Sequence, residues 1–250
     1  TGEANVYGWV TATVEHIYNK KTVRLENKHW HNNDHVEIVH DNTDGLQEAI
    51  NDNRDLALRN ITLPDGVYYT SRLNIPSNFA LFGNSKRTVI KQIPWNFDFY
   101  DDISFPNQRG NVLVPQEDNP EQITFRDLTI DGNMVNEVLW GEEQANFTVS
   151  FPNGSDITYD NVNIVNSVGS GVYALNNSRI RVSSCQFLDG GLTYSEDTVL
   201  SPLLAASSEF TTVSDNIFEN WVAALDLSVT RIGTVISNTI RNCGSGLLVF

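Results

Sequence analysis

Two segments of this chain, ITFRDLTIDG at residues 123–132 and ITYDNVNIVN at residues 157–166, align without a gap and decide the fold. Three more align with them in the same way: IRVSSCQFLD from Ile180, TTVSDNIFEN from Thr211 and GTVISNTIRN from Gly233. The starts lie 34, 23, 31 and 22 residues apart. A period near 22 residues, with longer steps taken up as insertions, is typical of a solenoid in which each repeat is one coil.

The columns of this alignment indicate which side chains face the interior. The third column is apolar in every copy, with Phe125, Tyr159, Val182, Val213 and Val235. The eighth is apolar as well, with Ile130, Ile164, Phe187, Phe218 and Ile240. The fifth is small and polar, with Asp127, Asn161, Ser184, Asp215 and Ser237. Stacked coils about 4.8 Å apart allow such side chains to hydrogen-bond along a ladder. The sequence therefore predicts an all-β protein, a right-handed parallel β-helix, with a β-sandwich as the less favoured alternative.

The sixth column predicts the surroundings of the cysteines and of two asparagines. Cys185, Asn216 and Asn238 share this column with two apolar residues, so we expect both asparagines to point inward, with Asn238 stacked on Asn216. Cys243 lies two coils beyond Cys185, and two coil steps exceed the Cα separation of under about 7 Å that a disulfide requires. Both cysteines should be free.

One helix is expected, at the stretch DNTDGLQEAI, residues 41–50. Asp41 or Thr43 can cap its first amides, and an apolar stripe follows at a spacing of three and four residues, Leu46, Ala49 and Ile50. The first coil of a solenoid exposes apolar surface and unpaired strand edges, which require a cover. We therefore predict a capping helix over about residues 43–52 at the start of a β-helix spanning 41–250. Residues 1–40 should form a small β module for attachment.

Composition and charge restrict the partners. The chain has 250 residues, 40% of them hydrophobic, which is enough for a core. Its 31 acidic and 16 basic residues give a net charge of −15, which disfavours a nucleic-acid surface. Partners should be neutral or cationic, although a local arginine cluster would still admit an acidic polysaccharide. No apolar run is long enough for a membrane span. His29 and His31 lack a third ligand at a suitable spacing, so no metal and no cofactor are predicted.

A family resemblance follows from two stretches of the N-terminal part. DNTDGLQEAIND at residues 41–52 and ITLPDGVYYTSRLNIPSNFALFGNSKRTVI at residues 61–90 resemble the capping region of the pectate-lyase-like β-helix superfamily. In character the chain is most similar to phage tailspike, tail or baseplate β-helix proteins. The resemblance covers about residues 41–250. It implies secreted or virion-borne proteins that meet carbohydrate, some as lyases or hydrolases and others as scaffolds. The N-T-D, D-D, G-H-G and R-I-K series of polygalacturonase-like members is not apparent, because no histidine follows His40.

Two insertions combine aromatic rings with carboxylates, as a sugar-binding site requires. Rings stack on the apolar face of a pyranose, and two carboxylates about 5–10 Å apart suffice for glycoside hydrolysis. We predict three carbohydrate-binding residues, Trp95, Tyr100 and Trp140. The weaker candidates for catalysis are five acids of the same insertions, Asp98, Asp101, Asp102, Glu142 and Glu143. The alternative is that the aromatics anchor loops against a coil or a neighbouring subunit while the acids are solvated.

The favoured interpretation is a virion structural protein of a phage or related viral tail, baseplate or spike that contacts host-surface glycan. By the resemblance, its partners would be other tail or baseplate proteins and further copies of itself, as a trimer. The alternative is a secreted polysaccharide depolymerase, a glycoside hydrolase or a lyase. We also expect further chain or another subunit to cover the apolar coil that ends at Phe250.

Overall fold

The fold is described from a computed structural model of the chain. It describes residues 14–19, 22–25, 41–56, 58–93, 111–133, 147–167, 169–191, 201–205, 207–227 and 230–248. Near the start, β1 (Val14–Asn19) pairs with β2 (Thr22–Leu25) as an antiparallel hairpin. The remainder of the predicted N-terminal module, including His29 and His31, lies outside the described residues, so the module stays a prediction.

Within the described residues the β-helix has three parallel sheets of seven strands each. Sheet 1 contains β3 (Asn60–Leu63), β6 (Ala80–Gly83), β9 (Glu121–Arg126), β12 (Ser155–Asp160), β15 (Arg179–Ser183), β18 (Phe210–Ser214) and β21 (Ile232–Ile236). Sheet 2 contains β4 (Gly66–Thr70), β7 (Thr88–Gln92), β10 (Thr129–Asp131), β13 (Asn163–Ser167), β16 (Gln186–Gly190), β19 (Ile217–Glu219) and β22 (Thr239–Arg241). Sheet 3 contains β5 (Leu73–Ile75), β8 (Leu113–Pro115), β11 (Phe147–Ser150), β14 (Ser170–Tyr173), β17 (Leu203–Leu204), β20 (Ala223–Asp226) and β23 (Ser245–Leu248).

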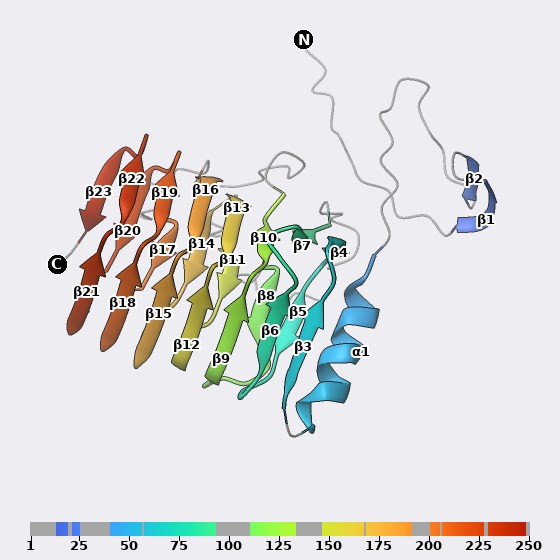
Figure 1. The fold of residues 1–250 in the computed structure, drawn as a ribbon, viewed down its shortest axis with the longest axis horizontal. Coiled ribbons are helices and arrows are strands. Elements are labelled where there is room, and N and C mark those ends of the chain that lie inside the picture. Colours follow the sequence, from blue (N-terminus) through green and yellow to red (C-terminus); the bar gives the residue numbers. More distant parts are fainter. Residues whose placement is uncertain are drawn as a thin grey trace, which may run out of the picture.

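The chain visits sheets 1, 2 and 3 in turn, and each circuit is one coil stacked on the previous one (Figure 1). The strand register is the one that the sequence alignment predicts, because Tyr159 pairs with both Phe125 and Val182. Those three side chains are fully buried, as are Ile130 and its counterparts in the next three coils. The prediction of a parallel β-helix is confirmed, with both apolar columns facing the interior.

The bends between sheets are made by single residues in the left-handed backbone conformation. Their φ angles lie between 50° and 62°, and they are Asn, Asp or Ser rather than Gly. The corner from sheet 1 to sheet 2 uses Asp127, Asn161, Ser184, Asp215 and Ser237, which is the polar fifth column of the alignment. Asn and Asp tolerate this conformation better than other side-chain-bearing residues. The column is therefore polar for a backbone reason as well as for the ladder, in which Asn161 Nδ2 donates to Asp127 Oδ1 at 2.6 Å.

The sixth column satisfies the backbone of these bends. Asn216 is buried; its Oδ1 accepts the amide of Cys185 at 2.8 Å and its Nδ2 donates to the carbonyl of Val182 at 3.0 Å. Asn238 repeats the arrangement one coil later, with its Oδ1 accepting from the Asn216 amide at 2.9 Å. Both asparagines point inward and stack as predicted. Their main partners, however, are backbone groups of the preceding coil.

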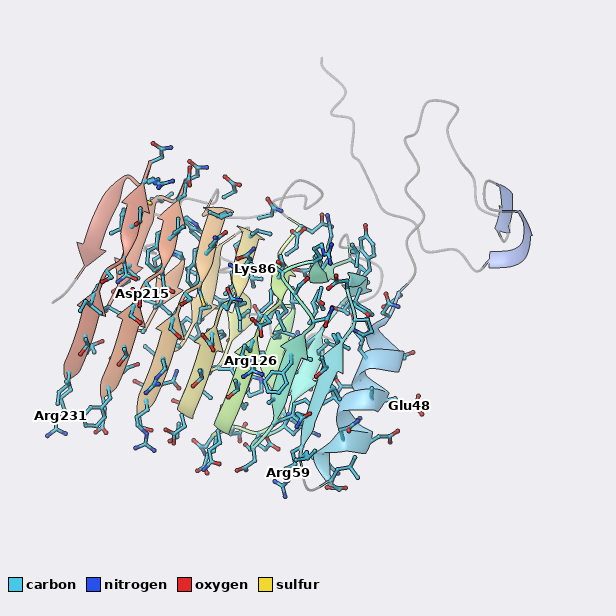
Figure 2. The ribbon with its side chains drawn as sticks, in the orientation of Figure 1. Glu48, Arg59, Lys86, Arg126, Asp215 and Arg231 are labelled. Atoms are coloured by element: carbon cyan, nitrogen blue, oxygen red, sulfur yellow. The ribbon has the colours of Figure 1, made fainter. Side chains whose placement is uncertain are left out.

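The predicted capping helix is present as α1 (Thr43–Arg54), packed against β3 and β5 at one end of the solenoid (Figure 1). Leu46 and Ile50 are buried, and the Thr43 amide donates to Asp41 Oδ1 at 2.8 Å. Figure 2 shows Glu48 on the side of α1 that faces away from the strands. The apolar stripe of α1 thus covers the first coil.

Side chains and backbone of the α1 region also replace a missing strand. The Asn42 amide donates to the Tyr69 carbonyl at 2.7 Å, beside the edge strand β4. At the edge of β5, Gln47 Nε2 donates to the Asn74 carbonyl at 3.0 Å, and the Asn74 amide donates to Gln47 Oε1 at 2.7 Å. These bonds occupy edge groups that would otherwise be open to pairing with another chain.

At the opposite end the inward columns become exposed. Val235 and Ile240 are 40% and 43% exposed, whereas Val213 and Phe218, one coil earlier, are fully buried. Both cysteines are free, as predicted, with Cys185 buried in the core. Among the described helices none is long and apolar enough to cross a membrane.

Candidate functional site

Three insertions leave the solenoid at one corner, the turn from sheet 2 to sheet 3, which we call the insertion corner. They are residues 94–110 between β7 and β8, 134–146 between β10 and β11, and 192–200 between β16 and β17. Strands β7 and β10 are neighbours in sheet 2, and β8 and β11 are neighbours in sheet 3. The first two insertions therefore start and end on adjacent coils, as expected for segments that contribute to one site.

All eight residues predicted for the site belong to the first two insertions and lie outside the described residues: Trp95, Asp98, Tyr100, Asp101, Asp102, Trp140, Glu142 and Glu143. Their roles stay predictions. The described part of the molecule supplies the surface next to which these insertions begin and end, and this surface is the outer face of sheet 3.

An aromatic pair lies on the outer face of sheet 3. Tyr173 is half-buried and falls between two core residues, Val172 and Ala174, so its ring projects outward from β14. Phe147, at the start of β11, stacks on it with ring centroids 4.1 Å apart and an interplanar angle of 20°. Burial raises the pKa of the Tyr173 hydroxyl, which stays protonated and able to donate a hydrogen bond. A stacked ring pair with a phenol at its edge suits the apolar face and hydroxyls of a sugar.

The neighbouring side chains of this face are shielded from solvent, unlike those of the other outer faces. Ser150 and Asp226, which flank the Tyr173 position on successive rungs with Leu204 between, are 8% and 7% exposed. On sheet 1 the corresponding outward residues include the exposed Arg126 and Arg181. Polar interactions are stronger where water is excluded. Asp226 is a carboxylate in such a place, beside the aromatic pair.

A second carboxylate, Asp131, organises the insertion corner itself. It is 8% exposed, and its Oδ1 accepts the Asn133 amide at 2.8 Å and Asn166 Nδ2 at 3.0 Å. Its Oδ2 lies 3.3 Å from Lys91 Nζ. With three partners this carboxylate is held in its charged form by its surroundings, so it positions the corner and is poorly placed to exchange a proton with a substrate.

Polar groups without partners gather at the same corner. Among the described residues, seven buried side-chain polar atoms have no hydrogen-bond partner, and four belong to this turn: Thr70 Oγ1, Asn111 Nδ2, Ser201 Oγ and Trp221 Nε1. The Trp221 ring fills the space beside Gly190, where a Cβ atom would lie only 2.3 Å from Cη2. Buried polar groups are normally satisfied, so their concentration here marks the corner as a place where other groups dock.

The arrangement can bind a hydroxyl-rich molecule, but it is not a complete catalytic centre. Asp226 is the carboxylate of the outer face of sheet 3 among the described residues, and glycoside hydrolysis requires a second one. No group of three or more metal-ligating side chains occurs in the described ranges. Tyr173 and Asp226 were missed in the sequence, although each stands between two inward apolar residues and alternation would have placed both outside.

Comparisons with known proteins agree with this architecture. Among solved structures, a proposed glycosyl hydrolase from Parabacteroides merdae matches with a TM-score of 0.55 and 13% identity, covering 83% of this chain and 92% of that one. The A-module of a mannuronan C-5 epimerase from Azotobacter vinelandii also has 13% identity, covering 85% and 93%, but its TM-score of 0.33 is too low to support an inference. No curated protein sequence matches the chain. The family described as "Right handed beta helix region" matches residues 106–250, more than half of the chain. Its coils, corners and cap are those of a parallel solenoid, and the chain belongs to the right-handed β-helix family.

Proposed function

We propose that the protein binds a polysaccharide on the outer face of sheet 3 and acts on it as a glycoside hydrolase or lyase. The observation that carries the proposal is the coincidence of three features at one place. The three insertions leave the solenoid at one corner, and that corner adjoins the stacked rings of Phe147 and Tyr173 and the shielded carboxylate of Asp226.

The similarity in fold to a proposed glycosyl hydrolase supports this choice without assigning a substrate. The earlier interpretation, a tail or baseplate protein of a virus, stays a prediction, because no feature of the described structure favours it over the polysaccharide-acting alternative. Virion partners, a trimer, and a virion or extracellular location likewise remain proposals.

Within this proposal the residues have distinct roles. Tyr173 and Phe147 stack on a sugar ring, and Asp226 accepts its hydroxyls or serves as one of two catalytic carboxylates. The second carboxylate would come from the insertions that carry Asp98, Asp101, Asp102, Glu142 and Glu143. Trp95, Tyr100 and Trp140 remain the predicted sugar-binding residues of those insertions.

The test compares the wild type with Tyr173→Ala, and uses Phe210→Ala as the matched control. Phe210 is an aromatic residue at the start of a sheet 1 strand and is 44% exposed, far along the circuit from the insertion corner. Binding to a panel of polysaccharides and release of new chain ends are measured. Tyr173→Ala should weaken binding roughly tenfold, by about 1–2 kcal/mol, and Phe210→Ala should not. Asp226→Asn should remove chain cleavage. Absence of binding to any glycan of the panel would contradict the proposal.

A further inference from the structure

The charge around the insertion corner is strongly one-sided. Residues 94–110 contain three acidic residues and one basic residue, Arg109. Residues 134–146 contain three acidic residues and residues 192–200 contain two, and neither segment has a Lys or Arg. Because all three segments leave the solenoid at this corner, much of the net charge of −15 is attached beside the outer face of sheet 3.

The described side chains at this place do not offset that charge. Lys91 is the lysine of the corner, and its Nζ lies 3.3 Å from Asp131 Oδ2, so its charge is already neutralised by a buried carboxylate. On the rungs around Tyr173 the outward residues are Ser150, Leu204 and Asp226, which are neutral or acidic. Arginines of the β-helix instead stand on sheet 1, as Arg126 and Arg231 do in Figure 2.

We infer that the glycan bound by this face carries no carboxylate or sulfate groups, so that the substrate class is a neutral or amino-sugar polysaccharide and not a polyuronate. This inference rests on the proposed function. A polyanion would bring like charges to a water-shielded face, where repulsion is weakly screened, and would lack a cation to pair with. Neutral sugars meet no such penalty, because ring stacking on Tyr173 and hydrogen bonding to Asp226 do not require charge.

The experiment uses three oligosaccharides of equal length: a glucose oligomer, a glucosamine oligomer and a galacturonate oligomer. Affinity of the full chain for each is measured at about 0.02 M and about 0.5 M salt, because salt screens exposed charges. The glucose or glucosamine oligomer should bind at least tenfold more tightly than galacturonate at low salt, and the difference should narrow at high salt. Tightest binding of galacturonate at low salt would overturn the inference. Binding of none of the three, or of any glycan in the larger panel, would contradict the proposed function instead.

A charge-introducing variant provides the second readout. Leu204 is half-buried between Tyr173 and Asp226 on the outer face, so Leu204→Lys places a cation within the site and Leu204→Gln serves as the uncharged control. If electrostatic exclusion determines the substrate class, Leu204→Lys should increase galacturonate affinity at least threefold at low salt, with the gain lost at high salt, and Leu204→Gln should not. An unchanged galacturonate affinity in a folded Leu204→Lys protein would count against the inference.

Discussion

At the scale of the residue, Asn216 shows how one side chain joins two coils. It is buried and serves the amide of Cys185 and the carbonyl of Val182, which lie in the preceding coil. Asn216→Leu should lower the free energy of unfolding by about 1–3 kcal/mol, because both backbone groups lose their partner in the interior. Thr212→Val, on the outer face of the same strand, should cost less than about 0.5 kcal/mol. Urea unfolding measures both, and equal stability of the two variants would show that the asparagine ladder contributes nothing.

The two thiols provide a second prediction at this scale. Burial raises the pKa of the Cys185 thiol to about 12, and only about one molecule in ten thousand carries the thiolate at pH 8. A thiol reagent should therefore modify the half-buried Cys243 in the native protein and both cysteines only after unfolding. Mass spectrometry of the labelled protein counts the modifications. Rapid labelling of Cys185 under native conditions would show that the core opens locally near this residue.

At the scale of the element, α1 is held by its apolar stripe and by the amide of Gln47. Gln47→Ala removes two hydrogen bonds to the backbone of Asn74 and should lower the free energy of unfolding by about 1–2 kcal/mol. Glu48→Ala is the control, since Glu48 lies next to it in α1 and is exposed. Thermal unfolding compares the two variants. If Gln47→Ala matched Glu48→Ala, the cap would depend on Leu46 and Ile50 alone.

At the scale of the whole molecule, charges of alternating sign join four successive coils at the corner from sheet 3 to sheet 1. Asp156 pairs with Arg179, and Arg231 Nη1 lies 3.6 Å from Glu209 Oε1. The hydrogen bonds from Arg179 hold the pKa of Asp156 below its ordinary value of 3.8. A carboxyl whose pKa is lowered by folding stabilises the protein above the unfolded value, and this stabilisation disappears as the pH falls through the folded pKa.

This charge pair predicts a pH-dependent difference between the wild type and Asp156→Asn. Asp156 has a φ of 59°, which asparagine tolerates, so the variant changes the charge and not the bend. The wild type should be slightly more stable at pH 6, within the range of about 0–1 kcal/mol for an exposed pair, and the difference should vanish below about pH 3. Melting temperatures across this range test it. A constant difference at every pH would exclude the ion pair as its cause.

The coil repeat, the interior columns and the cap could be predicted from the sequence because each is encoded locally and then repeated. Phe125 and Tyr159 occupy equivalent positions 34 residues apart, and stacking puts equivalent residues into the same environment. The sequence also located Leu46 and Ile50, since a helical stripe is a short-range pattern. Prediction extended to the ladder of Asn216 and Asn238 for the same reason.

Sheet 3 and the candidate site could not be predicted in this way. Its strands have only two to four residues, too few to show alternation, so Tyr173 and Asp226 had no recognisable signal when each coil was read alone. Their importance arises from stacking: Phe147 reaches Tyr173 from the preceding coil, and residues 94–110, 134–146 and 192–200 share a corner only because β7, β10 and β16 belong to one sheet. The sequence by itself determined which side chains face the core, because that choice is made within each coil. Only the tertiary structure decided which outward side chains meet, because that depends on the register between coils far apart in the chain.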